Sequence, residues 1–187
     1  MENLNIYQEY TLYQILMRIG TQPYIAITSD NDELLDTFIN EITKRIVKVK
    51  KVYDYPHEGK YTTPEYLTKI LTEDHDSLIL MNFNKVIDNN IKYYLSQNRK
   101  ISYDDAVYYQ LIGFREYLKN ASLIIPCSNK LTGEFFIDAQ LRFFVQLFNL
   151  DNINYISEEE ITGLVKRLRT IDYNQMNQEI EMKIDMD

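Results

Sequence analysis

The apolar positions along the chain follow two periods, and together these predict strands that alternate with helices. Nearly continuous apolar runs, typical of strands buried on both faces, occur at residues 24–28, 77–82 and 122–127. Weaker strand patterns occur at residues 48–53 and 143–148. Helical spacing predicts the remaining elements, at about residues 5–19, 30–47, 63–71, 85–120 with a break near Arg99, and 157–169.

This alternation favours one α/β domain over residues 1–170, with a mainly parallel sheet of about five strands and helices on both faces. The central strands are expected at residues 24–28 and 123–127, flanked by 78–82. Residues 171–187 form an acidic tail whose last eight residues, 180–187, alternate between apolar and charged side chains. Since a solitary strand is not stable in water, we expect this segment to add to a sheet edge of its own chain or of a second copy.

Two helix starts have the pattern of a capping box, in which a short polar residue precedes Glu by three positions. Asp30 with Glu33 has this spacing, and so does Ser157 with Glu160. We therefore expect Asp30 and Ser157 to cap the helices that follow them.

The turn after the first apolar run is acidic. Residues 28–33 read Thr-Ser-Asp-Asn-Asp-Glu. A phosphate-binding loop at this place is glycine-rich, so that backbone N–H groups close around phosphate, and it ends in a lysine that neutralises the charge. This turn has no glycine, no lysine and three carboxylates, which the start of a helix stabilises through its dipole. We expect Ser29, Asp30, Asn31 and Asp32 to start a helix without binding phosphate.

Three segments, in order, resemble the core of AAA+ and related phosphate-loop NTPases over roughly residues 7–169. Residues 24–38 are similar to the Walker A strand, loop and helix, and residues 77–82 to the Walker B strand. Residues 121–129 are similar to the sensor-one strand, which often ends in Asn. The segment 137–143 is similar to the one that carries a basic residue before the fifth strand.

The residues that define this family differ here. The Walker A glycines and lysine are missing, and Asn82 stands where the family has an acid that holds magnesium. Asn129 and Arg142 match the family in residue type only. The delta-type subunits of clamp loaders keep such a fold although their Walker A motif is degenerate. The resemblance therefore implies a nucleotide-binding fold without a nucleotide cofactor, and Arg142 or Lys130 would be the cations to reach a nucleotide if one bound.

The other candidate catalytic or metal-binding side chains have simpler structural interpretations. His57 and His75 are predicted in loops, where a solvated turn is favoured over a metal site, and Cys127 is predicted to be a buried small apolar residue. Glu181 and Lys183 resemble the Glu-x-Lys strand of metal-dependent nucleases, with Asp172 as an upstream acid that could help to hold magnesium. That nuclease pattern is the catalytic alternative.

A basic cluster lies within an acidic chain of net charge −8. Its residues could contact nucleic acid or an acidic partner, or could form a solvated helix end; they are Lys44, Arg45, Lys48, Lys50 and Lys51. The overall charge argues against a general nucleic-acid coat. The tyrosines, 16 in all, are interpreted mainly as packing residues or interface anchors.

Composition sets the remaining expectations. The excess of Tyr, Asn, Ile, Lys and Asp indicates an AT-rich genome, such as that of a virus or mobile element. The N-terminus has no signal-peptide pattern and the single cysteine forms no internal disulfide, so we expect a cytoplasmic protein, in the host cytoplasm if viral. The expected function is a non-catalytic interaction or assembly module, in replication or packaging, with a protein partner or a second copy and no membrane. A divergent active NTPase remains an alternative.

Overall fold

A computed structural model describes residues 4–52, 76–103, 105–106, 111, 121–129, 145–151 and 157–173. Two of the predicted elements, the helix at 63–71 and the terminal strand at 180–187, lie outside these residues. None of the helices in the described ranges combines the length and apolar character needed to cross a membrane.

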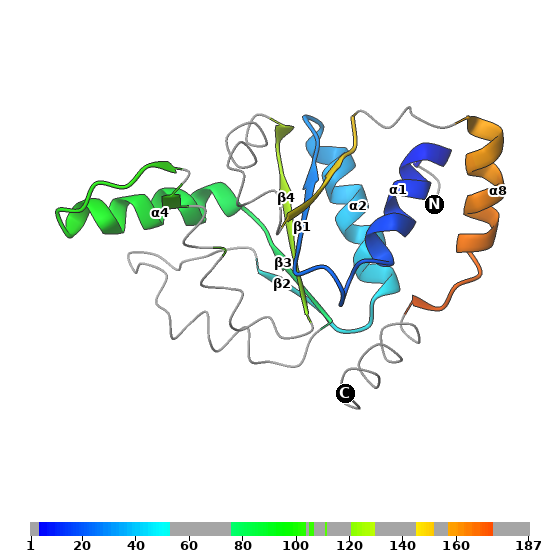
Figure 1. Cartoon of the computed structure of the whole chain (residues 1–187), viewed down its shortest axis with the longest axis horizontal. Coiled ribbons are helices and arrows are strands. Elements are labelled where there is room, and N and C mark those ends of the chain that lie inside the picture. Colours follow the sequence, from blue (N-terminus) through cyan, green and yellow to red (C-terminus); the bar gives the residue numbers. More distant parts are fainter. Residues whose placement is uncertain are drawn as a thin grey trace.

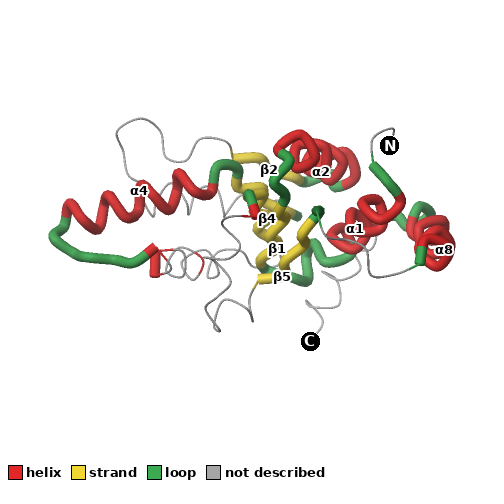
Figure 2. The backbone as a smooth tube through the Cα atoms, turned by 90° about the horizontal axis from the view of Figure 1, so that it is seen from above, coloured by secondary structure: helices red, strands yellow, loops and turns green. Residues whose placement is uncertain are grey.

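The described strands form one parallel sheet in the order β2-β3-β4-β1-β5 (Figures 1 and 2). The strands are β1 (Tyr24–Thr28), β2 (Val49–Val52), β3 (Ser77–Leu80), β4 (Ser122–Cys127) and β5 (Val145–Asn149). Every pairing between neighbours in this order is parallel. The expected parallel α/β fold is confirmed, and β1 and β4 are neighbours with β3 beside β4, as the apolar runs predict.

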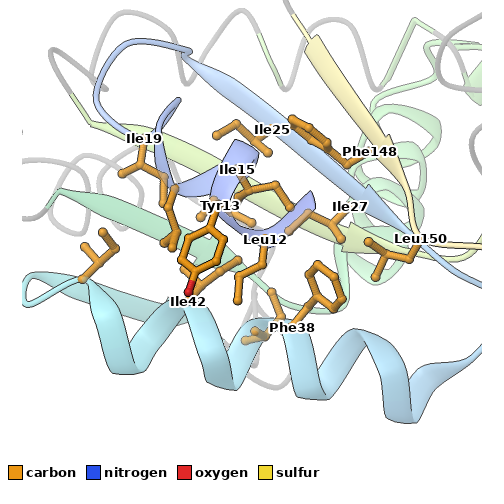
Figure 3. Packing of buried hydrophobic residues seen from close by; sticks show 14 of the residues in the cluster. Leu12, Tyr13, Ile15, Ile19, Ile25, Ile27, Phe38, Ile42, Phe148 and Leu150 are labelled. Carbon is orange, nitrogen blue, oxygen red and sulfur yellow. The ribbon is translucent and has the colours of Figure 1, made fainter. Parts of the chain in front are cut away.

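One face of the sheet packs against α1 (Ile6–Leu16) and α2 (Asp32–Arg45). Alternate strand residues point to this face, and Ile25, Ile79 and Ile124 are in register across three strands with no exposed surface. Leu12 and Phe38 come from the two helices and meet them in the same core (Figure 3). This layer holds β1 and α2 in fixed relation, which sets the geometry of the turn between them.

The other set of alternate strand residues is buried as well. Leu78, Leu123 and Ile125 are almost fully covered, and the Tyr24 hydroxyl donates a hydrogen bond to the Leu111 carbonyl oxygen. The helix α4 (Phe83–Ser96) follows β3 and buries Phe83 near its start. Strands buried on both faces explain the uninterrupted apolar runs in the sequence.

The last described helix, α8 (Glu158–Leu168), packs on α1. Arg169, just after it, donates from Nε and Nη2 to the two carboxylate oxygens of Glu9, each at 2.7 Å. The rings of Tyr13 and Tyr173 stack with their centroids 5.8 Å apart. These contacts join the C-terminal end of α8 to the N-terminal helix, far away in the sequence.

Element boundaries differ from the sequence expectation where side chains or turns end a helix early. The first helix ends at Leu16, because the chain turns before Gly20, whose φ of 85° suits glycine. The long predicted helix at 85–120 begins earlier, at Phe83, and its first part ends at Ser96, close to the expected break. Ser157 caps α8 as predicted, because its side chain accepts a hydrogen bond from the Glu160 N–H.

Candidate functional site

Three neighbouring strands have their carboxyl ends side by side, and we call this side of the sheet the carboxyl edge. Thr28 of β1 is in register with Cys127 of β4 and with Asn149 of β5, so the residues that follow these strands are brought close together. From β1 the chain crosses to β2 on one side, and from β4 it crosses to β5 on the other. In parallel α/β sheets, ligand sites lie at the carboxyl ends of the strands where the strand order changes direction in this way. This edge is therefore the candidate site.

The carboxylate of Asp151 lies at the centre of this edge. Its Oδ1 accepts a hydrogen bond from the Ser29 hydroxyl at 2.7 Å, and its Oδ2 accepts from the Asp30 N–H at 2.8 Å. The side-chain amide of Asn129 donates to the same Oδ2 at 2.6 Å. One carboxylate thus joins the ends of β1, β4 and β5.

The backbone holds Asp151 in this position. The Leu150 N–H donates to the Thr28 carbonyl at 2.8 Å, which extends the pairing of β5 and β1 past the last strand residue. The Asp151 N–H donates to the side-chain oxygen of Asn149 at 2.9 Å, forming a turn. The carboxylate is therefore carried into the β1–α2 turn by the sheet itself.

The three donors keep Asp151 ionised. Burial raises the pKa of Asp151, but hydrogen bonds from Ser29, from the Asp30 N–H and from Asn129 outweigh it and hold the pKa below its ordinary value. The negative charge lies beside the first turn of α2, where the helix dipole favours an anion. A carboxylate of the chain itself thus occupies the place that suits a bound anion.

Asn31, and not Asp30, caps α2, which corrects the sequence prediction. The Asn31 side chain accepts a hydrogen bond from the Leu34 N–H at 3.1 Å, and the helix begins at Asp32. The Asp30 N–H is held by Asp151, while the buried Ser29 hydroxyl oxygen accepts from the Asn31 N–H at 2.9 Å. These bonds place the turn one residue later than the capping-box pattern predicts.

The exposed acids of the turn remain at the surface. Asp30, Asp32 and Glu33 are exposed, and the last two lie in the first turn of α2. These carboxylates would repel a polyphosphate that approached the turn.

The structure brings together some of the predicted site residues and leaves others apart or undescribed. Ser29, Asp30, Asn31 and Asn129 share the Asp151 network. Asn82, at the position similar to Walker B, is exposed with a left-handed φ of 55°. Arg142 and Lys130 lie outside the described residues.

The basic cluster is partly neutralised. Lys44 Nζ lies 2.7 Å from Glu41 Oε1, and Arg45 pairs with the other oxygen of the same carboxylate. Burial raises the pKa of Glu41, but the hydrogen bonds from Lys44 and Arg45 outweigh it and lower that pKa overall. Lys48 is exposed, and the side chains of Lys50 and Lys51 in β2 lie outside the described part of the structure. Lys44 and Arg45 thus pair with a carboxylate of their own helix, α2, which agrees with the interpretation of these cations as part of a helix end.

Of the remaining candidates, the structure describes only Cys127 and Asp172. Cys127 is buried and burial raises its pKa to about 12, so it stays a thiol, in keeping with its interpretation as a small apolar residue. Asp172 is exposed after α8, whereas Glu181 and Lys183 lie outside the described residues, as do His57 and His75. Among the residues the structure describes, no group of three or more His, Cys, Asp or Glu side chains could hold a metal ion.

Sequence reasoning missed Asp151. Its signal was present, because it is the first acid after the weakly predicted strand at 143–148, and residues that follow parallel strands share one edge.

No known protein-family model matches this sequence, and no curated protein matches it significantly.

Proposed function

We propose that this chain is a non-catalytic, NTPase-like α/β domain that serves as an interaction or assembly module. The observation that carries the proposal is the Asp151 carboxylate in the β1–α2 turn. In a phosphate-loop protein that turn receives the phosphates. Here an anion that belongs to the chain takes the corresponding donors.

Four donors of the turn are used internally. The Asp30 N–H and the Ser29 hydroxyl bind Asp151, the Asn31 N–H binds Ser29, and the Leu34 N–H binds Asn31. A triphosphate would have to displace Asp151 and also overcome the exposed acids of the turn. The turn contains no lysine and no glycine that could offset that cost. Nucleotide binding is therefore disfavoured both by geometry and by charge.

The burial pattern supports a second helical layer. Leu78, Leu123 and Ile125 are covered on the face away from α1 and α2, and Tyr24 is bonded to Leu111 there. We therefore extend the proposal to helices on both faces of this sheet, the layout of many nucleotide-binding folds.

The interaction role is supported by the shape of the molecule. The helix α4 projects away from the sheet and the chain returns beside it, forming an arm (Figures 1 and 2). Tyr93 and Leu95 near the end of the arm are 42% and 53% exposed. An aromatic and an aliphatic side chain on a projecting element are typical of a contact surface. The setting that composition suggests, replication or packaging for a virus or mobile element, is part of this proposal.

Titration calorimetry with Mg-ATP tests the non-catalytic assignment. We expect no binding heat for the natural chain up to about millimolar nucleotide, a level at which even weak sites of about −4 kcal/mol are half filled. Micromolar binding would overturn the proposal and favour a divergent NTPase. The variant Asp151→Ala provides a comparison: since the exposed acids remain, we expect it to bind at most weakly.

A further inference from the structure

The end of the arm has a defined composition. We call the arm tip the set Lys92, Tyr93, Leu95, Arg99 and Lys100, all of which are exposed. Residues 89–103 contain these three cations and no Asp or Glu, although the chain as a whole has a net charge of −8. The arm tip is therefore a local basic and apolar surface on an acidic protein.

The arm tip has a fixed backbone. The Arg99 N–H donates to the Tyr94 carbonyl at 2.9 Å and the Asn98 N–H to the Leu95 carbonyl at 3.0 Å. Asn98 has a φ of 56°. These features form a Schellman motif, which ends a helix with one left-handed residue and satisfies its last carbonyls. The motif places Arg99 and Lys100 directly after the exposed end of α4.

A complementary surface lies elsewhere on the same chain. The helices α2 and α8 both begin at the upper edge of the molecule in Figure 1, where β1 and β5 end. We call this the acidic edge; it consists of exposed carboxylates, namely Asp30, Asp32, Glu33, Asp36, Asp151, Glu158, Glu159 and Glu160.

We propose that the arm tip of one copy docks on the acidic edge of a second copy through its exposed cations. This inference rests on the proposed interaction role and names the partner. The opposite charges of the two surfaces supply attraction and orientation. Since two different surfaces meet, the contact is head to tail and leads to a ring or to an open chain of copies.

Nucleic acid is the competing partner for the arm tip. An exposed tyrosine among cations could stack on bases while the cations contact phosphates. The net charge of −8 opposes the approach of a polyanion, and Leu95 gains nothing from stacking. The observations therefore favour a protein surface with exposed acidic groups, which the chain itself provides.

Sedimentation velocity over a range of protein concentrations tests the proposal. We expect the natural chain to self-associate at about 50 mM salt and to dissociate at about 500 mM salt, because added ions screen exposed charges. Arg99→Glu with Lys100→Glu should weaken self-association by about tenfold or more. The matched control, Lys166→Glu with Arg167→Glu, makes the same charge change on α8 and should associate at least as well as the natural chain.

A charge-swap variant makes the test specific. Glu158→Lys with Glu159→Lys should also weaken association, and a chain that carries both the arm and the edge changes should associate better than either of these two variants, since the exchanged side chains are again opposite in charge. Circular dichroism verifies that each variant is folded. A natural chain that stays monomeric at low salt overturns the proposal. So does an arm variant that associates normally but loses binding to a single-stranded oligonucleotide. Neither result bears on the Mg-ATP titration, which tests the non-catalytic assignment separately.

Discussion

Asp151 is the residue on which the chemistry of the edge depends, and its charge should show in the pH dependence of stability. Hydrogen bonds from Ser29, Asp30 and Asn129 outweigh burial and lower its pKa in the folded chain. A lowered folded pKa stabilises the protein above the ordinary aspartate pKa, and this contribution is lost as the pH falls through the folded value. Asp151→Asn should therefore lower the urea midpoint at neutral pH, and the difference from the natural chain should shrink on acidification.

The exposed carboxylate of Asp36 on α2 provides the control for this comparison. Asp36→Asn removes the same charge without touching the Ser29, Asp30 and Asn129 donors. We expect it to have little effect on the urea midpoint at any pH. Equal pH profiles for Asp151→Asn and Asp36→Asn would mean that the network contributes no stability.

The start of α2 provides a second residue-scale prediction. The Asn31 side chain accepts the Leu34 N–H, whereas Asp30 takes part in the network through its backbone N–H. Asn31→Ala should therefore cost about 0.5–2 kcal/mol of unfolding free energy, the usual effect of a lost cap. Asp30→Ala should cost less, because its backbone bond to Asp151 remains. Chemical denaturation that found the reverse order would restore Asp30 as the cap.

At the scale of elements, the sheet core carries most of the packing. Ile79 and Ile124 are adjacent in β3 and β4 and have no exposed surface. Truncation of either to Ala should cost about 2–5 kcal/mol, since it leaves a cavity in a packed layer. Leu95→Ala, on the exposed arm, provides the contrast and should be nearly neutral in urea denaturation. A small effect at Ile124 would contradict the central position of β4.

One forked ion pair contributes to the attachment of α8 to α1. The hydrogen bonds from Arg169 are the main cause that lowers the pKa of Glu9, so this pair stabilises the fold above the ordinary glutamate pKa and the effect is lost as the pH falls. Lysine cannot make both bonds. Arg169→Lys should therefore lower the urea midpoint more than Arg167→Lys does, and this difference should shrink as the pH falls below the ordinary glutamate pKa. Arg167 lies in the same helix and makes only a 3.4 Å bond to a local carbonyl.

The elements show what a single sequence can predict here and what it cannot. The apolar runs predict β1, β3 and β4 because these strands are buried on both faces, and that requirement is local. The cap of α2 is different, since Asp30, Asn31 and Asp32 are all acceptable cap residues in sequence. Asp151, more than a hundred residues away, determines which of them is used, by holding the Asp30 N–H. Only the folded sheet brings that carboxylate to the turn.

At the scale of the whole molecule, charge is distributed unevenly. The cations of the arm tip lie at one end of the long axis, and the acidic edge lies where β1 and β5 end and α2 and α8 begin (Figure 1). Such a distribution gives an acidic protein a directional way to associate in spite of its net charge. The proposed function rests on two features, a carboxylate of the chain itself in the β1–α2 turn and an arm that reaches outward (Figure 1).

The most direct test of the Asp151 network in the β1–α2 turn is an NMR titration that follows the Asp151 carboxyl carbon and the Asp30 amide together. We predict a pKa for Asp151 below the ordinary aspartate value, and an Asp30 amide shift that changes with the same midpoint, because the two groups share a hydrogen bond. An Asp151 that titrates at its ordinary value, with an Asp30 amide that does not follow it, would contradict the claim that this carboxylate fills the turn.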